Sequence, residues 1–326
     1  EKQMAAALHF TLPQQRLHPA FSALLDDLNG AKGYELAIAN RLWGQKNYPF
    51  RQEFLAGIES RYRGGFEQVD YQNDAEGARG TINRWVEART RGKIRELLRK
   101  PDIKPLTRLV LTNAIYFKGN WSARFDPRST VAGQFARQGG AAVSVPFMSQ
   151  KGKFPYLREK DFEMLELPYA GGRLSMLVLL PNRGVMLDRV EAQLSSARLR
   201  SWRSGLEETD VRLFLPRFRT AARFELNAPL DSLGMKDAFD EDRADFSGIT
   251  KKKGLYISKV IHKAFVDVNE EGTEAAAATA VVMSTKSIGM EVRFRADRPF
   301  VFAIVDRESE SVLFLGRLMN PEEPEE

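Results

Sequence analysis

The sequence of 326 residues contains no cysteine. Disulfide bonds, thiolate catalysis and zinc sites with cysteine ligands are therefore excluded. Only three histidines occur, His9, His18 and His262, and no two of them have the spacing of a metal-ligating pair. There is also no GxSxG elbow, no P-loop and no glycine-rich dinucleotide fingerprint after a strand. The common enzyme chemistries are poorly supported, and we expect neither a metal nor a cofactor.

Long hydrophobic runs are missing as well. The longest apolar stretch, residues 174–180 (LSMLVLL), is far shorter than the roughly twenty residues of a membrane helix. Its length and composition favour one buried strand. With 43% hydrophobic and 28% charged residues, the chain has the composition of a globular protein. We expect a soluble protein with no membrane segment.

The charge is unevenly distributed. The formal net charge is +6, and basic residues concentrate at 89–100, 216–224 and 251–253. Such clusters can attract polyanions such as nucleic acid or sulfated sugars. Acidic residues are interspersed, however, and no aromatic residues alternate with the basic ones to stack on bases. A solvated surface and a polyanion site are both open interpretations.

The amino terminus resembles the interior of a helix. EKQMAAALHF has helical composition, yet it begins without a capping residue and without an initiator Met. We therefore expect further residues upstream of Glu1 in the natural protein. The lack of a signal peptide consequently carries no weight.

Helical patterns dominate the first third of the chain and strand patterns the remainder. Helices are predicted at 1–10, about 19–28, 49–64 and 75–92, the last with Ile82, Trp85 and Val86 at helical spacing, and a strand at 35–45. Further strands are predicted at 107–121, 143–150, 161–170, 173–182, 211–219, 255–268, 291–306 and 311–320. Helices followed by strands predict an α+β fold with mainly antiparallel sheets. No linker divides the chain, so residues 1–326 are interpreted as one domain.

Residues 269–290, NEEGTEAAAATAVVMSTKSIGM, connect two apolar strand-like segments. Alanine and glutamate favour a surface helix here. With a period of two, one side of the same segment carries only small or uncharged residues: Thr273, Ala275, Ala277, Thr279, Val281 and Met283. A strand of that kind could enter a tightly packed sheet without obstruction. The residues alone leave both interpretations open.

This segment with its flanks, FRADRPFVFAI and LFLGRLMNP, resembles the reactive-centre loop and signature region of the serpins, a family of serine protease inhibitors. Further blocks match in family order over essentially the whole chain: LTNAIYFKGNW, ELPYAGG, LFLPRF, LGMKDAF, ADFSGI and SKVIHKAFVDVNEEGTEAA. The resemblance implies the serpin fold, with a large central mixed or antiparallel β-sheet, further sheets, surrounding helices and an exposed reactive-centre loop at 269–290.

The resemblance also implies a mechanism of the inhibitory type. A protease cleaves the loop, and the loop then inserts into the central sheet and traps the acyl-enzyme irreversibly. The hinge that must insert first has an inhibitory pattern: Glu270, Glu271, Gly272, Thr273, Glu274, Ala275, Ala276, Ala277 and Ala278. Glycine at 272 permits the bend, and the alanines that follow can be buried without steric cost.

Counting from the hinge glycine and back from EVRFRADRPF places the cleaved bond between Lys286 and Ser287. A lysine before the bond suits proteases whose specificity pocket ends in an aspartate, as in trypsin. The expected partner is therefore a trypsin-like serine protease, held in a covalent acyl complex by a monomeric inhibitor.

Four residues have supporting roles by resemblance. His262 with Asn113 corresponds to the shutter beneath the sheet, and Trp121 to the breach where insertion begins. Glu270 is expected to pair with Arg217. These residues would act as structural gates and not as catalysts. Family members normally carry two helices and a strand before the position of Glu1, and one of those helices supplies serines that complete the shutter.

Other functions remain open at this point. A non-inhibitory carrier or chaperone of the same family, or an inactive truncated or cleaved form, would also fit. An enzyme with unrecognised chemistry is disfavoured because no nucleophile and base pair is evident in the sequence. The resemblance suggests an extracellular or periplasmic location.

Overall fold

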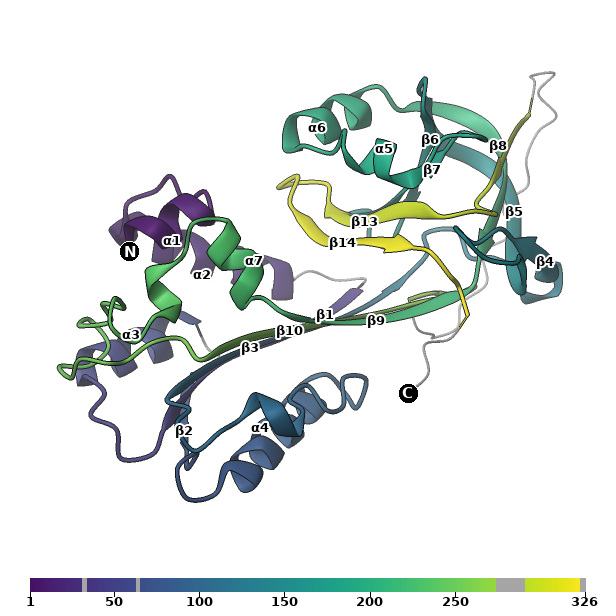
Figure 1. Cartoon of the computed structure of the whole chain (residues 1–326). Helices are drawn as coiled ribbons and strands as arrows, with labels where there is room; N and C mark the ends of the chain where they lie inside the picture. The colour runs from purple at the N-terminus through teal and green to yellow at the C-terminus, as the bar shows by residue number, and fades with distance from the viewer. Residues whose placement is uncertain (31–33, 63–64, 274–290, 323–326) are drawn as a thin grey trace. The chain divides into compact units, whose positions relative to one another are not determined.

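The computed structural model describes residues 1–30, 34–62, 65–273 and 291–322. The α-helices are α1 Lys2–Ala7, α2 Gln14–Gly30, α3 Gln52–Tyr62, α4 Ala75–Arg89, α5 Leu187–Glu191, α6 Ser196–Ser204 and α7 Asn227–Ser232. The strands are β1 Tyr34–Gln45, β2 Phe66–Val69, β3 Leu109–Asn120, β4 Val131–Phe135, β5 Val143–Arg158, β6 Phe162–Pro168, β7 Leu174–Pro181, β8 Glu207–Pro216, β9 Phe218–Glu225, β10 Lys259–Val268, β11 Gly272–Thr273, β12 Val292–Arg295, β13 Phe300–Asp306 and β14 Val312–Leu318. Figure 1 shows these elements along the chain.

Contacts divide the chain into two compact units. The first consists of Glu1–Ala31, Leu36–Tyr116 and Ala221–Phe265, and the second of Lys32–Glu35, Phe117–Thr220 and Val266–Glu326. The boundaries between the two units at 35/36, 116/117, 220/221 and 265/266 all fall inside strands. As a result, β1, β3, β9 and β10 each contribute residues to both units.

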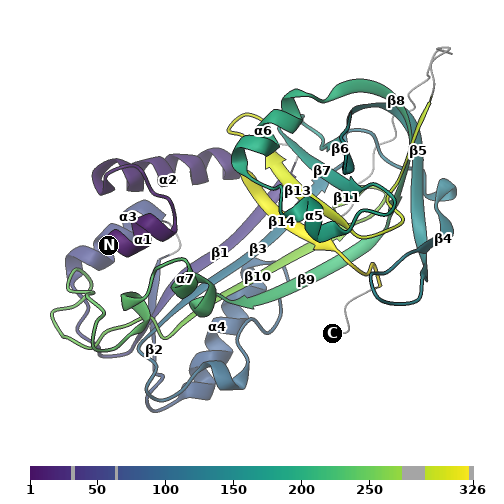
Figure 2. The same cartoon turned by 45° about the horizontal axis from the view of Figure 1, so that its top comes forward.

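The first unit is built on a sheet with the strand order β2-β1-β3-β10-β9 (Figures 1 and 2). Strands β3 and β10 are parallel and pair directly, residue by residue, from Val110 with Lys259 to Tyr116 with Phe265. No other strand therefore lies between β3 and β10 over these seven residue pairs. The pairing of β1 with β2 is also parallel.

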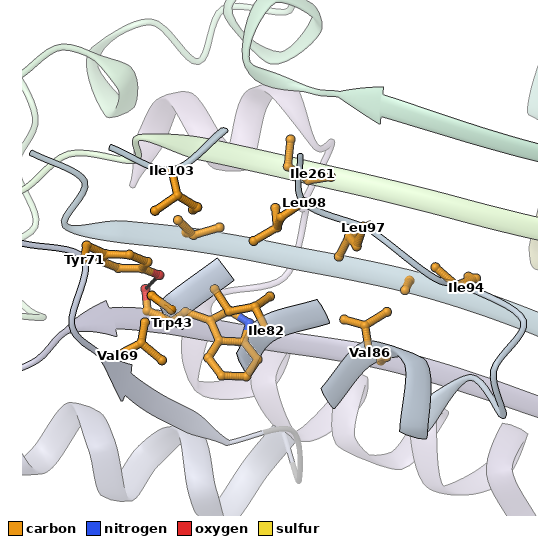
Figure 3. Packing of buried hydrophobic residues seen from close by; sticks show 14 residues of the cluster. Trp43, Val69, Tyr71, Ile82, Val86, Ile94, Leu97, Leu98, Ile103 and Ile261 are labelled. Atoms are coloured by element: carbon orange, nitrogen blue, oxygen red, sulfur yellow. Dashed lines mark hydrogen bonds between the residues drawn. The ribbon is translucent and has the colours of Figure 1, made fainter. Parts of the chain in front are cut away.

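Helix α4 covers one face of this sheet. Ala78, Ile82 and Val86 recur every four residues, which places them on one side of the helix, and all three are buried. They pack against residues of β1, β3 and β10, among them Trp43 and Ile261, as Figure 3 shows. Asp74 caps the start of the helix, because its side chain accepts a hydrogen bond from the Gly77 amide at 2.8 Å. A second cluster includes Ala7 of α1, Leu109 of β3, and Met235, Ala238, Leu255 and Ile257.

The second unit contains a sheet with the order β12-β8-β5-β6-β7-β13-β14, and β4 pairs with β5. Every residue of β7 and β13 is buried, so the apolar run at 174–180 is a core strand as the sequence predicts. Helices α5 and α6 bury Leu187, Val190 and Trp202 against β6, β7 and β13. In the described parts of the chain, no helix is long and apolar enough to cross a membrane.

Several predicted elements differ from the structure. Helices α5, α6 and α7 were not expected, although Ser195 caps α6 by accepting from the Arg198 amide. Helix α2 begins five residues before Pro19 and contains it, whereas proline usually marks a helix start. The sheets are mixed, because the pairs β1–β2, β3–β10 and β12–β8 are parallel.

Candidate functional site

The segment that follows β10 turns sharply at Asn269 to Gly272. The Asn269 amide donates to the Gly272 carbonyl at 2.9 Å, and the Gly272 amide donates back to the Asn269 carbonyl at 3.2 Å. Gly272 has φ 132°, and a Cβ added there would lie 2.1 Å from the Gly119 carbonyl oxygen. Both the backbone conformation and the close approach to β3 therefore require glycine at this position.

Immediately after this turn the chain is already a strand. Residues Gly272 and Thr273 form β11, which pairs antiparallel with β3, Gly272 opposite Asn120 and Thr273 opposite Gly119. The amide of Trp121 donates to the Glu271 carbonyl at 2.9 Å, which extends the same contact. The beginning of the predicted loop is thus fixed along the end of β3.

Trp121 holds the turn from beside it. Its side chain is 2% exposed, and its indole Nε1 donates to the Asn269 carbonyl at 2.9 Å. The ring stacks on Tyr169 with centroids 4.6 Å apart and planes 11° from parallel. The residue expected at the breach therefore contacts the backbone from which the predicted loop departs.

Glu270 is anchored by two residues that are distant in sequence. Arg217 donates from Nε to both carboxylate oxygens at 2.7 Å, and the Thr130 hydroxyl donates to Oε1. The Glu270 side chain is 6% exposed and that of Arg217 is 44% exposed. Burial alone would raise the pKa of Glu270, but the hydrogen bonds from Arg217 and Thr130 outweigh it and lower that pKa. The carboxylate is therefore held in its charged form.

His262 and Asn113 lie opposite one another on β10 and β3, and they hydrogen-bond through His262 Nδ1 and Asn113 Oδ1. The Asn113 amide nitrogen donates in turn to Asn40 Oδ1 on β1. Because this leaves only the Asn113 oxygen to accept, the neutral imidazole carries its proton on Nδ1. Burial lowers the pKa of His262. A chain of three polar side chains thus crosses three neighbouring strands.

A cavity of about 590 Å³ borders this polar chain inside the first unit. Asn40 and Asn113 line it together with Leu25 of α2 and with Phe54 and Ile58 of α3. The face of β3 and β10 that carries Asn113 is therefore less tightly covered than the face under α4.

Several predicted site residues lie outside the described residues. They are Glu274, Ala275, Ala276, Ala277, Ala278, Lys286 and Ser287. Their roles remain predictions.

The basic cluster at 216–224 faces carboxylates. Besides Arg217 with Glu270, Arg219 Nε lies 2.8 Å from Asp267, and Arg223 pairs with Asp102. Much of this positive charge is consequently balanced within the protein. Polyanion binding at 89–100 and 251–253 stays a prediction.

Two contributors were missed in the sequence. Asn40 interrupts the period-two series Leu36, Ile38 and Leu42 on β1, and that single polar residue was a usable signal. Thr130 offered none, because it lies 140 residues from Glu270 and follows a short 3₁₀-helix, Pro127–Ser129.

Comparison with known proteins gives consistent matches. The family model described as serpin (serine protease inhibitor) matches residues 1–321. The leukocyte elastase inhibitor of Sus scrofa is 44% identical over 331 residues, which is 98% of this chain and 87% of the relative. Human serpin B11 is 42% identical over 311 residues, 94% of this chain and 79% of the relative.

Solved structures agree. Human thyroxine-binding globulin, in complex with thyroxine, has a TM-score of 0.89 at 33% identity, covering 98% of this chain and 85% of that protein. Uncleaved ovalbumin has a TM-score of 0.88 at 32% identity, and the match covers 98% of this chain and 87% of ovalbumin. The predicted α+β fold with its mixed sheets and helices is confirmed.

One expectation is wrong. The sequence suggests an extracellular or periplasmic location, but the relatives most similar to this chain include leukocyte elastase inhibitors and B-group serpins, and this similarity points away from secretion.

Proposed function

Since the chain belongs to the serpin family of serine protease inhibitors, we propose that it is an irreversible suicide-substrate inhibitor of trypsin-like serine proteases. A protease attacks the bond between Lys286 and Ser287 and forms an acyl-enzyme. Residues from Thr273 onward then insert between β3 and β10 before the acyl-enzyme is hydrolysed. In this proposal residues 1–326 act as one domain and as a monomer.

The observation that carries the proposal is the register of β11 on β3. Continuing the antiparallel pairing of Gly272 with Asn120 brings Ala275 opposite Phe117, Ala277 opposite Ile115 and Thr279 opposite Asn113. The first two residue pairs of the inserted strand therefore exist before cleavage. Insertion only has to extend them.

The energetics support this extension. β3 and β10 pair directly over seven residues, and that parallel contact is exchanged for two antiparallel contacts with the new strand. About ten additional backbone hydrogen bonds at about 1 kcal/mol each give a gain on the order of 10 kcal/mol. The residues that would face Asn113 and His262 are small or uncharged, so their burial adds no large penalty.

Insertion also changes the hydrogen bonds among Asn40, Asn113 and His262. In the continued register Thr279 enters between Asn113 and His262, which must then part. A threonine hydroxyl can both donate and accept, so it can satisfy groups on each side. Asn113 keeps its bond to Asn40 because that bond lies on the other side of β3.

The lysine at 286 supports a trypsin-like target. An aspartate at the end of the specificity pocket selects a basic residue, whereas the pocket of elastase is small. The relatives named leukocyte elastase inhibitor share 41–44% identity with this chain, so the residue before the bond is free to differ from theirs.

Incubation with trypsin tests the proposal. We expect a complex that survives boiling in detergent. Lys286→Ala should lower the rate of trypsin inhibition by at least about 100-fold, since each 1.4 kcal/mol of lost transition-state binding is tenfold. Lys253→Ala, an exposed lysine elsewhere, is the matched control. Unchanged inhibition by Lys286→Ala would mean that the bond is misplaced.

Thr273→Arg separates insertion from recognition. A charge entering a dry sheet is costly, so this variant should be cleaved by trypsin without forming a stable complex. Full inhibition by Thr273→Arg would exclude insertion in this register.

A carrier is the second candidate, favoured by the similarity to a thyroxine-binding structure. Clean cleavage of the unaltered chain after Lys286, with no complex at any ratio of protease to inhibitor, would support the carrier and end the inhibitor proposal.

A further inference from the structure

The exposed face of β12, β8 and β5 in the second unit carries a row of basic residues, and Asp210 lies two residues before Arg212 on the same face of β8. Arg293 on β12 lies opposite Arg212 on β8, and Arg212 lies opposite Lys151 on β5. Residues directly opposite one another point to the same face of a sheet. Three cationic side chains consequently stand in one row across three neighbouring strands.

Two members of this row lack a balancing charge. Lys151 is 60% exposed and lies 3.0 Å from Glu291. Arg212 and Arg293 are exposed, and neither has an acidic partner among the described residues. Like charges placed directly opposite one another destabilise a sheet. The facing charges themselves therefore bring the fold no stability, and the row is better suited to meeting an external anionic surface.

An aromatic ring holds the arginines in place. The guanidinium groups of Arg212, Arg293 and Arg295 lie 5.9, 5.1 and 5.1 Å from the centroid of Phe214. Arg295 also lies 4.5 Å from the centroid of Phe147. Such cation–π contacts restrict the conformations of the arginine side chains, so less conformational entropy is lost when a partner binds. We call Lys151, Arg212, Arg293 and Arg295 the cationic face.

The positive charge continues beside the cationic face. Arg183 and Arg298 donate to Asp297 at 2.9 and 2.8 Å, and Arg295 lies 3.7 Å from the same carboxylate. One aspartate is thus shared by three arginines. These three arginines and Arg293 line a hollow of about 500 Å³. Asp297 and Glu163 are the acidic residues that line this hollow, and its four arginines outnumber them.

The position in the sequence indicates the partner. Arg293 follows Lys286 by seven residues, a stretch of at most about 25 Å. A protease domain of about 220 residues has a radius of gyration of about 17 Å. A protease bound at Lys286 therefore cannot be far from the cationic face.

We propose that the cationic face is a second docking surface for the target protease, engaging an acidic region of the protease surface and accelerating association. This rests on the proposed inhibitory function. It adds to that function a preference among proteases of equal bond specificity: those with acidic surfaces are captured faster, because complementary charge raises association rates more than it raises affinity.

Anionic and cationic trypsin provide matched probes, since both cleave after lysine. In Arg212→Gln/Arg293→Gln, the association rate with anionic trypsin should fall about 3- to 10-fold at low salt, and its dependence on salt should flatten. Association with cationic trypsin should stay the same or rise. Lys252→Gln/Lys253→Gln removes the same charge at other exposed lysines and should leave both rates within twofold.

Folding is checked in the same variants. Removing the facing like charges offsets the loss of the two cation–π contacts with Phe214, so the melting temperature should stay nearly unchanged. An unaltered preference for anionic trypsin in Arg212→Gln/Arg293→Gln would overturn the proposal. The proposal would also be overturned if the unaltered chain bound heparin and this variant did not, while both trypsin association rates stayed the same. The cationic face would then bind a polyanion and not the protease.

Failure of the inhibitory function can be recognised separately. If the unaltered chain forms no covalent complex, binding of anionic trypsin with its catalytic serine replaced by alanine still measures the encounter. Weaker binding by Arg212→Gln/Arg293→Gln than by the lysine control supports the docking surface, and equal binding overturns it.

Discussion

At the scale of single residues, His262 couples the pairing of β3 and β10 to protonation. Its neutral ring donates from Nδ1 to Asn113, and its pKa lies below the ordinary value because the ring is buried. The folded protein therefore prefers the neutral imidazole, whereas the unfolded chain takes up a proton near pH 6.5. Acid must weaken this part of the sheet before it affects carboxylates.

The sign follows from linkage. The stabilisation from His262 is complete above about pH 6.5 and is lost as pH falls from there toward the lower pKa of the folded state, at no more than about 1.4 kcal/mol per pH unit. In urea unfolding between pH 7.5 and 5.5, His262→Gln should be less stable at the upper pH but should lose less stability on acidification. An equally steep loss in His262→Gln would assign the pH dependence to other groups.

The role of a single residue could be predicted from the sequence where the local backbone allows only one type of residue. Gly272 was singled out for backbone freedom, and the reason lies in its φ of 132° and in the 2.1 Å that would separate an added Cβ from the backbone of β3. Asn40 and Thr130 escaped because their importance depends on neighbours in space. Thr130 reaches Glu270 across 140 residues of sequence, and no local pattern encodes such a contact.

At the scale of elements, α3 is weakened by a glycine in its middle. A Cβ added at Gly57 would meet nothing within 4 Å, and Gly57 lines the cavity of about 590 Å³. Glycine inside a helix costs about 0.5–1 kcal/mol relative to alanine. Gly57→Ala should therefore raise the free energy of unfolding by about that amount, measured by urea denaturation.

Gly44 on β1 provides the contrast. A Cβ there would lie 2.4 Å from Phe66 Cζ and 2.6 Å from Phe50 Cζ, so Gly44→Ala must displace both rings. It should destabilise by about 1–3 kcal/mol. If both alanine variants shifted stability in the same direction, the local packing described for α3 and β1 would be wrong.

Strands were easier to predict than short helices. β7 and β13 are buried along their whole length, so their continuous apolar runs could be identified without any partner. Helices α5 and α7 have only five and six residues, too few for a helical period to appear. Sheet direction could not be deduced, since the parallel pairing of β3 with β10 joins segments about 150 residues apart.

At the scale of the whole molecule, four strands carry the chain through both units. β1, β3, β9 and β10 each have residues in the first and in the second unit. A new strand that extends β11 along β3 would therefore run from residues of one unit to residues of the other. Its hydrogen bonds would stabilise both.

Cleavage should consequently raise the thermal stability of the whole chain. A gain on the order of 10 kcal/mol, divided by an unfolding entropy of about 0.7 kcal/mol/K for a chain of this size, corresponds to a rise of about 15 °C. Calorimetry before and after cleavage within 274–290 measures this rise in melting temperature. The cleavage is made by a cysteine protease, because that enzyme has no catalytic serine to be trapped as the acyl-enzyme. Thr273→Arg is the control and should show a much smaller rise; a cleaved chain that melts at its original temperature would contradict insertion.

The stacking of Trp121 on Tyr169 has an optical consequence. The indole is almost completely shielded from water, and its N–H is bonded to the Asn269 carbonyl. Indole emission shifts in wavelength and intensity when the polarity or hydrogen bonding around the ring changes. Any movement of the backbone at 269–273 will therefore alter the fluorescence of this residue, and the protein carries a built-in reporter at the starting point of strand insertion without the need for an attached dye.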